Sequence, residues 1–223
     1  MAARLDIAMN QNSPWKLVDG RASLDTDRWA GHIDLAKPGS GLSLTSAHKP
    51  GLISLLAVEF VRPHEPFVKD CFVRQSDLIL AYPQREQRTF SLQLDYRIIA
   101  SREAQLLIEL WVSIQTYLLD THPSVKVSCP GSETPAKASQ PIVATAGDLS
   151  FAWFIHPRDQ SDTKLVADKS NARVQAQLFG HFMEKGVIRR ARLRCLVSQK
   201  PLSKVDIDNA QSDFADSPLP LTA

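Results

Sequence analysis

The sequence predicts an all-β protein, a large antiparallel β-sandwich with little helix. Apolar and polar residues alternate over residues 90–99 and again over residues 104–118, which is the period of a half-buried strand. Many shorter β-rich segments follow one another at close spacing. Fourteen prolines and nine glycines among 223 residues indicate many turns, as a sandwich of short strands requires.

The two alternating segments predict a hairpin. A helix over residues 104–118 would leave Leu106, Ile108 and Val112 on its polar side, so the strand is favoured. The short polar link ASREAQ joins strands of similar length, as an antiparallel hairpin needs. The core face of the pair consists of every second residue: Phe90, Leu92, Leu94, Tyr96, Ile98, Leu106, Ile108, Leu110, Val112, Ile114 and Leu118.

The other elements follow from the same pattern. A Pro-Gly turn, AKPGSG, separates two of them, and the composition of residues 130–141 indicates a loop. No segment combines helical periodicity with capping residues. Strands are predicted over residues 16–18, 22–24, 32–35, 42–45, 52–61, 68–74, 78–82, 125–129, 149–155, 174–179 and 187–197.

Three parts are expected along the chain: an N-terminal extension (1–14), a β-sandwich domain (15–198) and a flexible acidic tail (199–223). The tail has a net charge of −2, few large apolar residues and three prolines, so disorder is expected. The remaining charge of the chain is +4.

Composition indicates which binding partners and which cellular compartment to expect for the protein. A net charge of +2 makes a nucleic-acid partner unlikely by composition, and no apolar run is long enough for a membrane span. The first residues contain no apolar stretch of signal-peptide length. Cys71, Cys129 and Cys195 form no metal or disulfide spacing and lie in apolar patterns, which indicates buried thiols in a reducing, cytoplasmic compartment.

The polar face of the hairpin is the candidate ligand surface. A turn centred near Arg102 would place Asp95 and Arg97 opposite residues 107–109, and Gln93 near Glu109 or Trp111. Carboxylates, a guanidinium and amides bind sugar hydroxyls, and an indole stacks on a sugar ring. The alternative is an ordinary solvated sheet face. The candidate ligand-binding residues are Gln93, Asp95, Arg97, Glu109, Trp111 and Gln115.

The last strand carries Arg190, Arg192 and Arg194 in a row. Such a row binds phosphate or a polyanion, or it is a solvated face or an edge strand charged against aggregation. None of the six histidines has the local spacing of a metal site, so no metal and no cofactor is expected. His156 is the best candidate for an acid/base role with a distant carboxylate, but the sequence assigns no catalytic residue.

Three stretches resemble a known family: DCFVRQSDLILAYPQ (70–84), LIELWVSIQTYLLDTHPSV (107–125) and MEKGVIRRARLRCLV (183–197). They are similar to uncharacterised proteins from planctomycete bacteria with a β-supersandwich shape like the galactose-mutarotase-like fold. The resemblance implies a carbohydrate-binding or carbohydrate-processing domain, with a carbohydrate as the expected partner. The alternative is a non-catalytic interaction or structural β-sandwich, for which the sequence names no protein partner.

Overall fold

A computed structural model describes residues 13–46, 49–60, 68–86, 89–102, 104–131, 133–134 and 137–218. Within these ranges most of the chain forms antiparallel strands in three sheets, which confirms the predicted all-β sandwich. Residues 1–12, which contain most of the predicted N-terminal extension and the region tested for a signal peptide, lie outside the described residues.

The largest sheet has seven strands in the order β12-β13-β16-β10-β9-β8-β7. Its two longest neighbours, β9 and β10, are the predicted hairpin, and β16 lies on the other side of β10. The strands are β12 (Ile142–Ala146), β13 (Leu149–Ile155), β16 (Ile188–Ser198), β10 (Gln105–Gln115), β9 (Ser91–Arg102), β8 (Asp77–Tyr82) and β7 (Asp70–Arg74).

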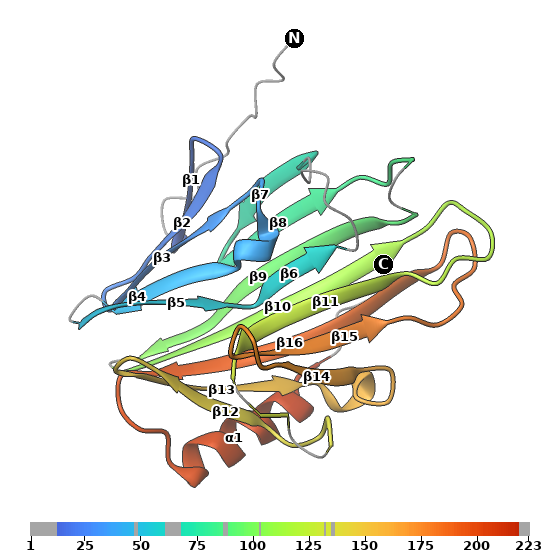
Figure 1. Cartoon of the computed structure of the whole chain (residues 1–223). Coiled ribbons are helices and arrows are strands. Elements are labelled where there is room, and N and C mark those ends of the chain that lie inside the picture. The colour runs from blue at the N-terminus through green and yellow to red at the C-terminus, as the bar shows by residue number, and fades with distance from the viewer. Residues whose placement is uncertain are drawn as a thin grey trace.

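Two smaller sheets form the other layer (Figure 1). The five-stranded sheet is a meander of β1 (Trp15–Val18), β2 (Arg21–Asp25), β3 (Trp29–Asp34), β4 (Leu42–Ser46) and β5 (Lys49–Leu55). A 3-10 turn, η1 (Pro38–Ser40), occupies the predicted Pro-Gly turn. The four-stranded sheet consists of β14 (Lys164–Asp168), β15 (Arg173–Phe179), β11 (Ser124–Pro130) and β6 (Ala57–Phe60). A second 3-10 turn, η2 (Pro157–Asp159), follows β13.

Leu56 divides one predicted strand into two. The sequence predicts a single strand over residues 52–61, whereas β5 and β6 belong to different sheets. Leu56 has φ 51, a left-handed conformation that is unfavourable for Leu, so the chain turns there. Two buried contacts hold the turn: the Leu56 N–H donates to Cys129 Sγ at 3.2 Å, and the Tyr96 hydroxyl donates to the Leu56 carbonyl at 3.0 Å.

One apolar core lies between the layers, and it contains side chains from all three sheets. The predicted core face of β10 is confirmed, because its apolar residues from Leu106 to Ile114 are at most 1% exposed. Leu118, which the sequence placed on the same face, is 46% exposed. Thr116, two residues before it, is fully buried. The three cysteines are free and buried, as predicted, and burial raises the pKa of Cys71 and Cys129 to about 12.

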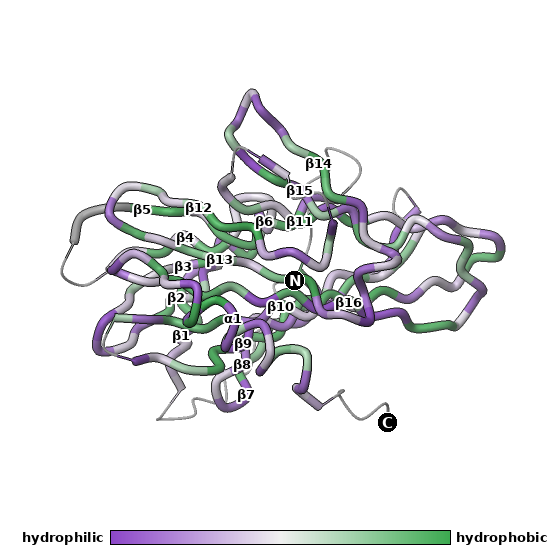
Figure 2. Tube along the Cα trace, turned by 90° about the horizontal axis from the view of Figure 1, so that it is seen from below, coloured by the Kyte–Doolittle hydropathy of each residue, from purple (hydrophilic) through white to green (hydrophobic). Residues whose placement is uncertain are grey.

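The tail is not structureless. It forms helix α1 (Lys204–Ala215), so the expectations of a disordered tail and of no capped helix are wrong for this segment. Ser203 and Asp206 form a capping box at its start. The helix lies on the face of the seven-stranded sheet that points away from the core (Figures 1 and 2). We call this the outer face. The helix buries Ala210 and Phe214 there.

Two strands were not predicted, β12 and β14. Both are short, five-residue edge strands of half-exposed residues, so their sequences carry little of the alternation that marks a strand. The hairpin register differs from the prediction by two residues. Asp95 lies opposite Trp111 and Gln93 opposite Ser113, because Arg102 pairs with Gln105 and the turn therefore lies beyond Arg102. A bulge at Ile99 of β9 moves the register back by one residue.

Candidate functional site

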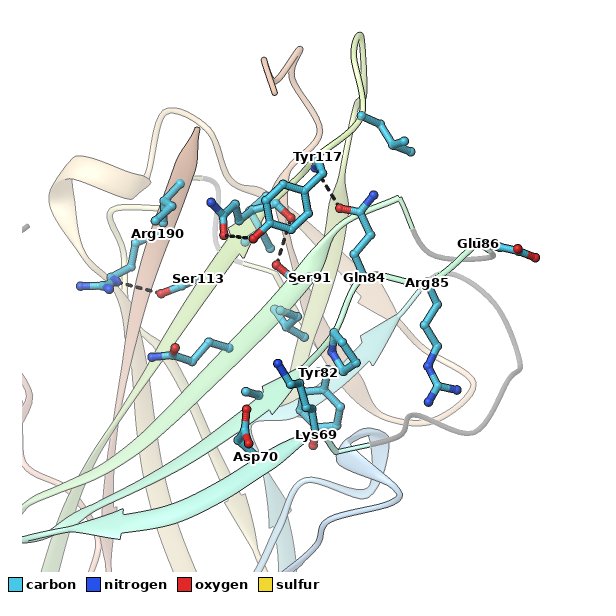
Figure 3. A pocket seen from close by; sticks show the side chains of 18 residues that line it. Lys69, Asp70, Tyr82, Gln84, Arg85, Glu86, Ser91, Ser113, Tyr117 and Arg190 are labelled. Carbon is cyan, nitrogen blue, oxygen red and sulfur yellow. Dashed lines mark hydrogen bonds between the residues drawn. The ribbon is translucent and has the colours of Figure 1, made fainter. Parts of the chain in front are cut away.

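A pocket of about 870 Å³ lies at one end of the seven-stranded sheet (Figure 3). Neighbouring strands β7, β8, β9, β10 and β16 contribute to it, together with the chain that follows β8 and β10. Its lining residues are Lys69, Asp70, Ala81, Tyr82, Pro83, Gln84, Arg85, Glu86, Ser91, Leu92, Gln93, Ser113, Ile114, Gln115, Tyr117, Leu118, Ile188 and Arg190.

Tyr117 is the prominent aromatic residue of the pocket. Its side chain is 58% exposed, and its hydroxyl donates to Gln115 Oε1 at 3.3 Å (Figure 3). The Tyr117 backbone N–H donates to Gln84 Oε1 at 2.9 Å, which fixes the chain just beyond β10. Ser91 donates to the Gln115 carbonyl at 3.2 Å. A phenol ring is therefore held in solvent beside amide and hydroxyl groups, the combination that sugar recognition uses.

Charged side chains of both signs surround these groups. Lys69, Arg85 and Arg190 are cationic, and Asp70 and Glu86 are anionic. Arg190 donates from Nε to Ser113 Oγ at 2.8 Å, and its guanidinium lies 5.3 Å from the centre of the Trp111 ring. The pocket can thus make charge-assisted hydrogen bonds to hydroxyl, carboxylate or sulfate groups.

Trp111 lies next to the pocket, between two arginines. The guanidinium of Arg97 lies 4.0 Å from the ring centre, and that of Arg190 lies 5.3 Å from it. Arg97 is on β9 and Arg190 is on β16, the two strands that flank β10. The indole N–H donates to Glu109 Oε2 at 2.9 Å. Trp111 thus has cation–π contacts and a hydrogen bond within the protein. A sugar that stacked on its ring would have to displace an arginine.

Glu109 is the centre of a buried ion pair. Its side chain is 3% exposed, and Arg194 donates to Oε1 from Nε at 3.0 Å and from Nη2 at 2.5 Å. The remaining Arg194 nitrogen, Nη1, donates to the Ala210 carbonyl of α1 at 3.1 Å. The helix therefore covers this pair and shares its hydrogen bonds.

Arg192 is buried under the end of the same helix at 3% exposed. Its Nη1 donates to Ser217 Oγ at 3.2 Å and to the Pro218 carbonyl at 3.3 Å, and its Nη2 lies 2.5 Å from His156 Nε2. Asp159 accepts the backbone N–H of Arg192 at 2.9 Å. Two interpretations of the arginine row, a solvated face and a charged edge strand, are therefore wrong for Arg192 and Arg194. Both side chains are buried, and β16 has a neighbouring strand on each side.

The predicted ligand residues divide into two groups. Gln93 and Gln115 line the pocket. The other four lie beside it in the polar network of the outer face: Asp95, Arg97, Glu109 and Trp111. Burial is the main reason that the pKa of Asp95 is raised, and the Gln93 amide donates to it at 2.8 Å, which acts in the opposite direction. Ligand binding by these six residues stays a prediction.

The sequence reading missed most of the pocket. Tyr117 continues the alternation of Gln115, so the sequence pattern places it on the polar face, but it is not one of the six predicted ligand-binding residues. Gln84 and Lys69 carried none, because their nearness to β10 depends on the order of strands in the sheet. The acid/base candidate, His156, is 3% exposed beneath α1 and does not line the pocket.

The described residues contain neither a metal-binding cluster nor a membrane-spanning helix. Within these ranges, no group of three or more His, Cys, Asp or Glu side chains is placed to hold a metal ion. None of the helices in the described part of the chain is long and apolar enough to cross a membrane.

Similarity to known proteins lies in the fold alone. No family model and no curated protein matches the chain. A crystal structure of a heparan sulfate lyase HepC mutant from Pedobacter heparinus has a TM-score of 0.50 at 8% identity, over 82% of this chain and 36% of that one. A heparinase III with methylated lysines has a TM-score of 0.41 at 8% identity, over 79% and 32%. The chain thus spans about a third of the length of these structures, and the first of them supports a β-sandwich fold of this kind.

Proposed function

We propose that the chain is a carbohydrate-binding or carbohydrate-processing domain of the β-supersandwich type, similar to the galactose-mutarotase-like fold. The ligand occupies the pocket beside Tyr117. The observation that carries the proposal is the exposed phenol ring held next to Gln84 and Gln115 in a pocket of about 870 Å³. That volume accommodates a small-molecule ligand such as a mono- or disaccharide.

The fold neighbour adds support of a coarser kind. HepC is named a heparan sulfate lyase, and sheet architecture of this type is therefore compatible with carbohydrate chemistry. A cytoplasmic location is part of the proposal, and its support is the set of three free, buried thiols.

Binding of a panel of sugars at millimolar concentration tests the proposal. Isothermal titration calorimetry of the full chain should show a bound sugar, and Tyr117→Ala should weaken it by about tenfold, because a stacking contact contributes roughly 1 kcal/mol or more. Leu119→Ala is the matched control, since this side chain is 75% exposed and does not line the pocket. Equal loss in both variants, or no bound sugar, would contradict the proposal.

A second function has its own observation. Large apolar side chains are exposed beside the pocket, which is the composition of a protein-binding surface. They are Leu118, Leu119, Phe182, Val187 and Ile188, each more than 40% exposed. Concentration-dependent self-association, or a partner retained by this surface while no sugar binds, would favour the non-catalytic interaction protein.

A further inference from the structure

The outer face beneath α1 holds a buried cation that makes no direct ion pair among the described residues. Arg194 pairs with Glu109, whereas the guanidinium of Arg192 contacts the Ser217 hydroxyl, the Pro218 carbonyl, the His156 ring and the Phe214 ring. The carboxylates of Asp159 and Glu109 attract it from farther away. A buried guanidinium ordinarily pairs with a carboxylate, sulfate or phosphate. The site thus has the chemistry of an anion-binding position that is filled by neutral groups.

Carbonyl oxygens of α1 and of the chain after it accept from the two arginines. The Ala210 carbonyl, inside the helix, accepts from Arg194, and the Pro218 carbonyl, beyond the helix end at Ala215, accepts from Arg192. These neutral acceptors occupy positions that the anionic groups of a ligand could take.

The apolar contact of α1 with the sheet is separate from the main core. Ala210 and Phe214 are buried in a cluster with Ala152, Phe154 and Leu196, and Ile207 is partly buried against it. Phe214 also lies under the Arg194 guanidinium at 4.5 Å. Contacts to arginine, which an anion can replace, are thus one part of the docking, beside hydrogen bonds from Gln105 to Asp206 and from Gln211 to the Ser139 carbonyl.

The covered arginines are continuous with the pocket. Arg190, Arg192 and Arg194 lie on one face of β16, spaced roughly 7 Å apart along the strand. Arg190 lines the pocket, and the next two lie beneath α1. A chain molecule bound in the pocket could therefore extend along the row only if α1 moved away.

We infer that α1 is a displaceable cover, and that the anionic groups of an acidic polysaccharide compete with its C-terminal end for Arg192 and Arg194. The inference rests on the proposed function and adds to it the class of ligand and a means of regulation. We choose a polysaccharide over a nucleic acid because the Trp111 ring, the aromatic ring beside the row, already contacts the Arg97 guanidinium at 4.0 Å and bonds to Glu109, so stacking of bases on it would have to displace a partner.

Hydrogen exchange of the full chain tests the cover directly. A heparin oligosaccharide should accelerate exchange of the α1 amides while those of β10 stay protected, and a neutral dextran oligosaccharide of equal length should not. Bound heparin with unchanged protection of α1 would overturn the inference. An oligodeoxynucleotide that opens α1 as strongly as heparin would overturn the choice of a polysaccharide.

Variants of the helix test the competition. Phe214→Ala weakens the cover and should raise heparin affinity several-fold, whereas Val205→Ala, at a helix position 66% exposed, should leave it unchanged. Gln211 donates to the Ser139 carbonyl at 2.8 Å, so cysteines at these two positions can be joined by a short bis-maleimide. The cross-linked chain should bind heparin more weakly than the same variant before linking.

The outcomes separate the two proposals. Affinities that are the same for Phe214→Ala, Val205→Ala and the cross-linked chain would overturn the cover, and sugar binding that depends on Tyr117 would then still support the pocket. Conversely, opening of α1 by heparin with no Tyr117-dependent sugar binding would support the cover and contradict the pocket.

Discussion

At the scale of single residues, Glu109 explains why the second face of β10 is polar. It joins β10 to β16 through Arg194, and it orients Trp111 through the indole N–H. Two buried charges are costly to desolvate, and their attraction offsets this cost only when both are well bonded. The pair therefore specifies which strands meet, and its loss on one side leaves an uncompensated charge.

Glu109→Gln should lower the free energy of unfolding by about 3–5 kcal/mol, because the buried Arg194 guanidinium loses its carboxylate. The double variant Glu109→Leu/Arg194→Met removes both charges. It should lose less free energy of unfolding than the sum of the losses in the single variants Glu109→Leu and Arg194→Met. Urea unfolding of the four proteins in a double-mutant cycle measures the coupling. Additive losses would show that the two side chains do not interact.

Asp95 has the opposite character, a buried carboxyl with a raised pKa. Its stabilising contribution is present at low pH, where it is protonated, and is lost as the pH rises through its folded pKa. Asp95→Asn keeps an oxygen for the Gln93 amide and removes the charge, so it should stabilise the protein at pH 7 and leave stability near pH 3 unchanged. A variant that is no more stable than the parent at pH 7 would contradict this account.

At the scale of elements, α1 depends on its first turn. The Ser203 side chain accepts from the Asp206 N–H at 3.1 Å, and Asp206 Oδ2 accepts from the Ser203 N–H at 3.0 Å. Ser203→Ala should destabilise the helix by about 1 kcal/mol and speed exchange of its amides. Val205→Ala, which alters an exposed neighbour, should not, and equal effects would mean that the cap is unimportant.

The hairpin could be predicted from the sequence and α1 could not, for physical reasons. Residues 90–99 and 104–118 alternate because one face of each strand is buried in the core. The helix has only a narrow apolar stripe of Ile207, Ala210 and Phe214, and both this stripe and its capping box lie in a segment whose composition is mostly polar. The register differed by two residues because the exact position of the turn cannot be read from alternation.

At the scale of the whole molecule, the site depends on the order of the strands. Arg190 and Lys69 are distant in the sequence and line one pocket because β16 and β7 belong to the same sheet as β10. Alternation tells which face a residue occupies, but it does not tell which strand lies next to it. Alternation therefore predicted strands β9 and β10 and their polar face, but it did not predict the pocket at one end of the sheet.

Stability of the whole molecule should fall between pH 6.5 and 4 because of His156. Burial first, and then the charges of Arg192 and Arg158, lower its pKa to about 4, against the smaller opposing effect of Glu109. In this range the unfolded chain binds a proton that the folded chain does not, so His156 destabilises the protein by up to about 3 kcal/mol as the pH falls.

His156→Gln isolates this contribution from that of the carboxyls, since burial raises the pKa of Asp159 and Asp95 and so acts with the opposite sign. Urea midpoints measured from pH 7.5 to 4.5 should fall less steeply in the variant than in the parent. His122→Gln, at an exposed position, is the matched control and should follow the parent. Parallel curves for all three proteins would show that His156 takes up its proton equally in the folded and unfolded states, and that the end of α1 is not docked against a neutral imidazole.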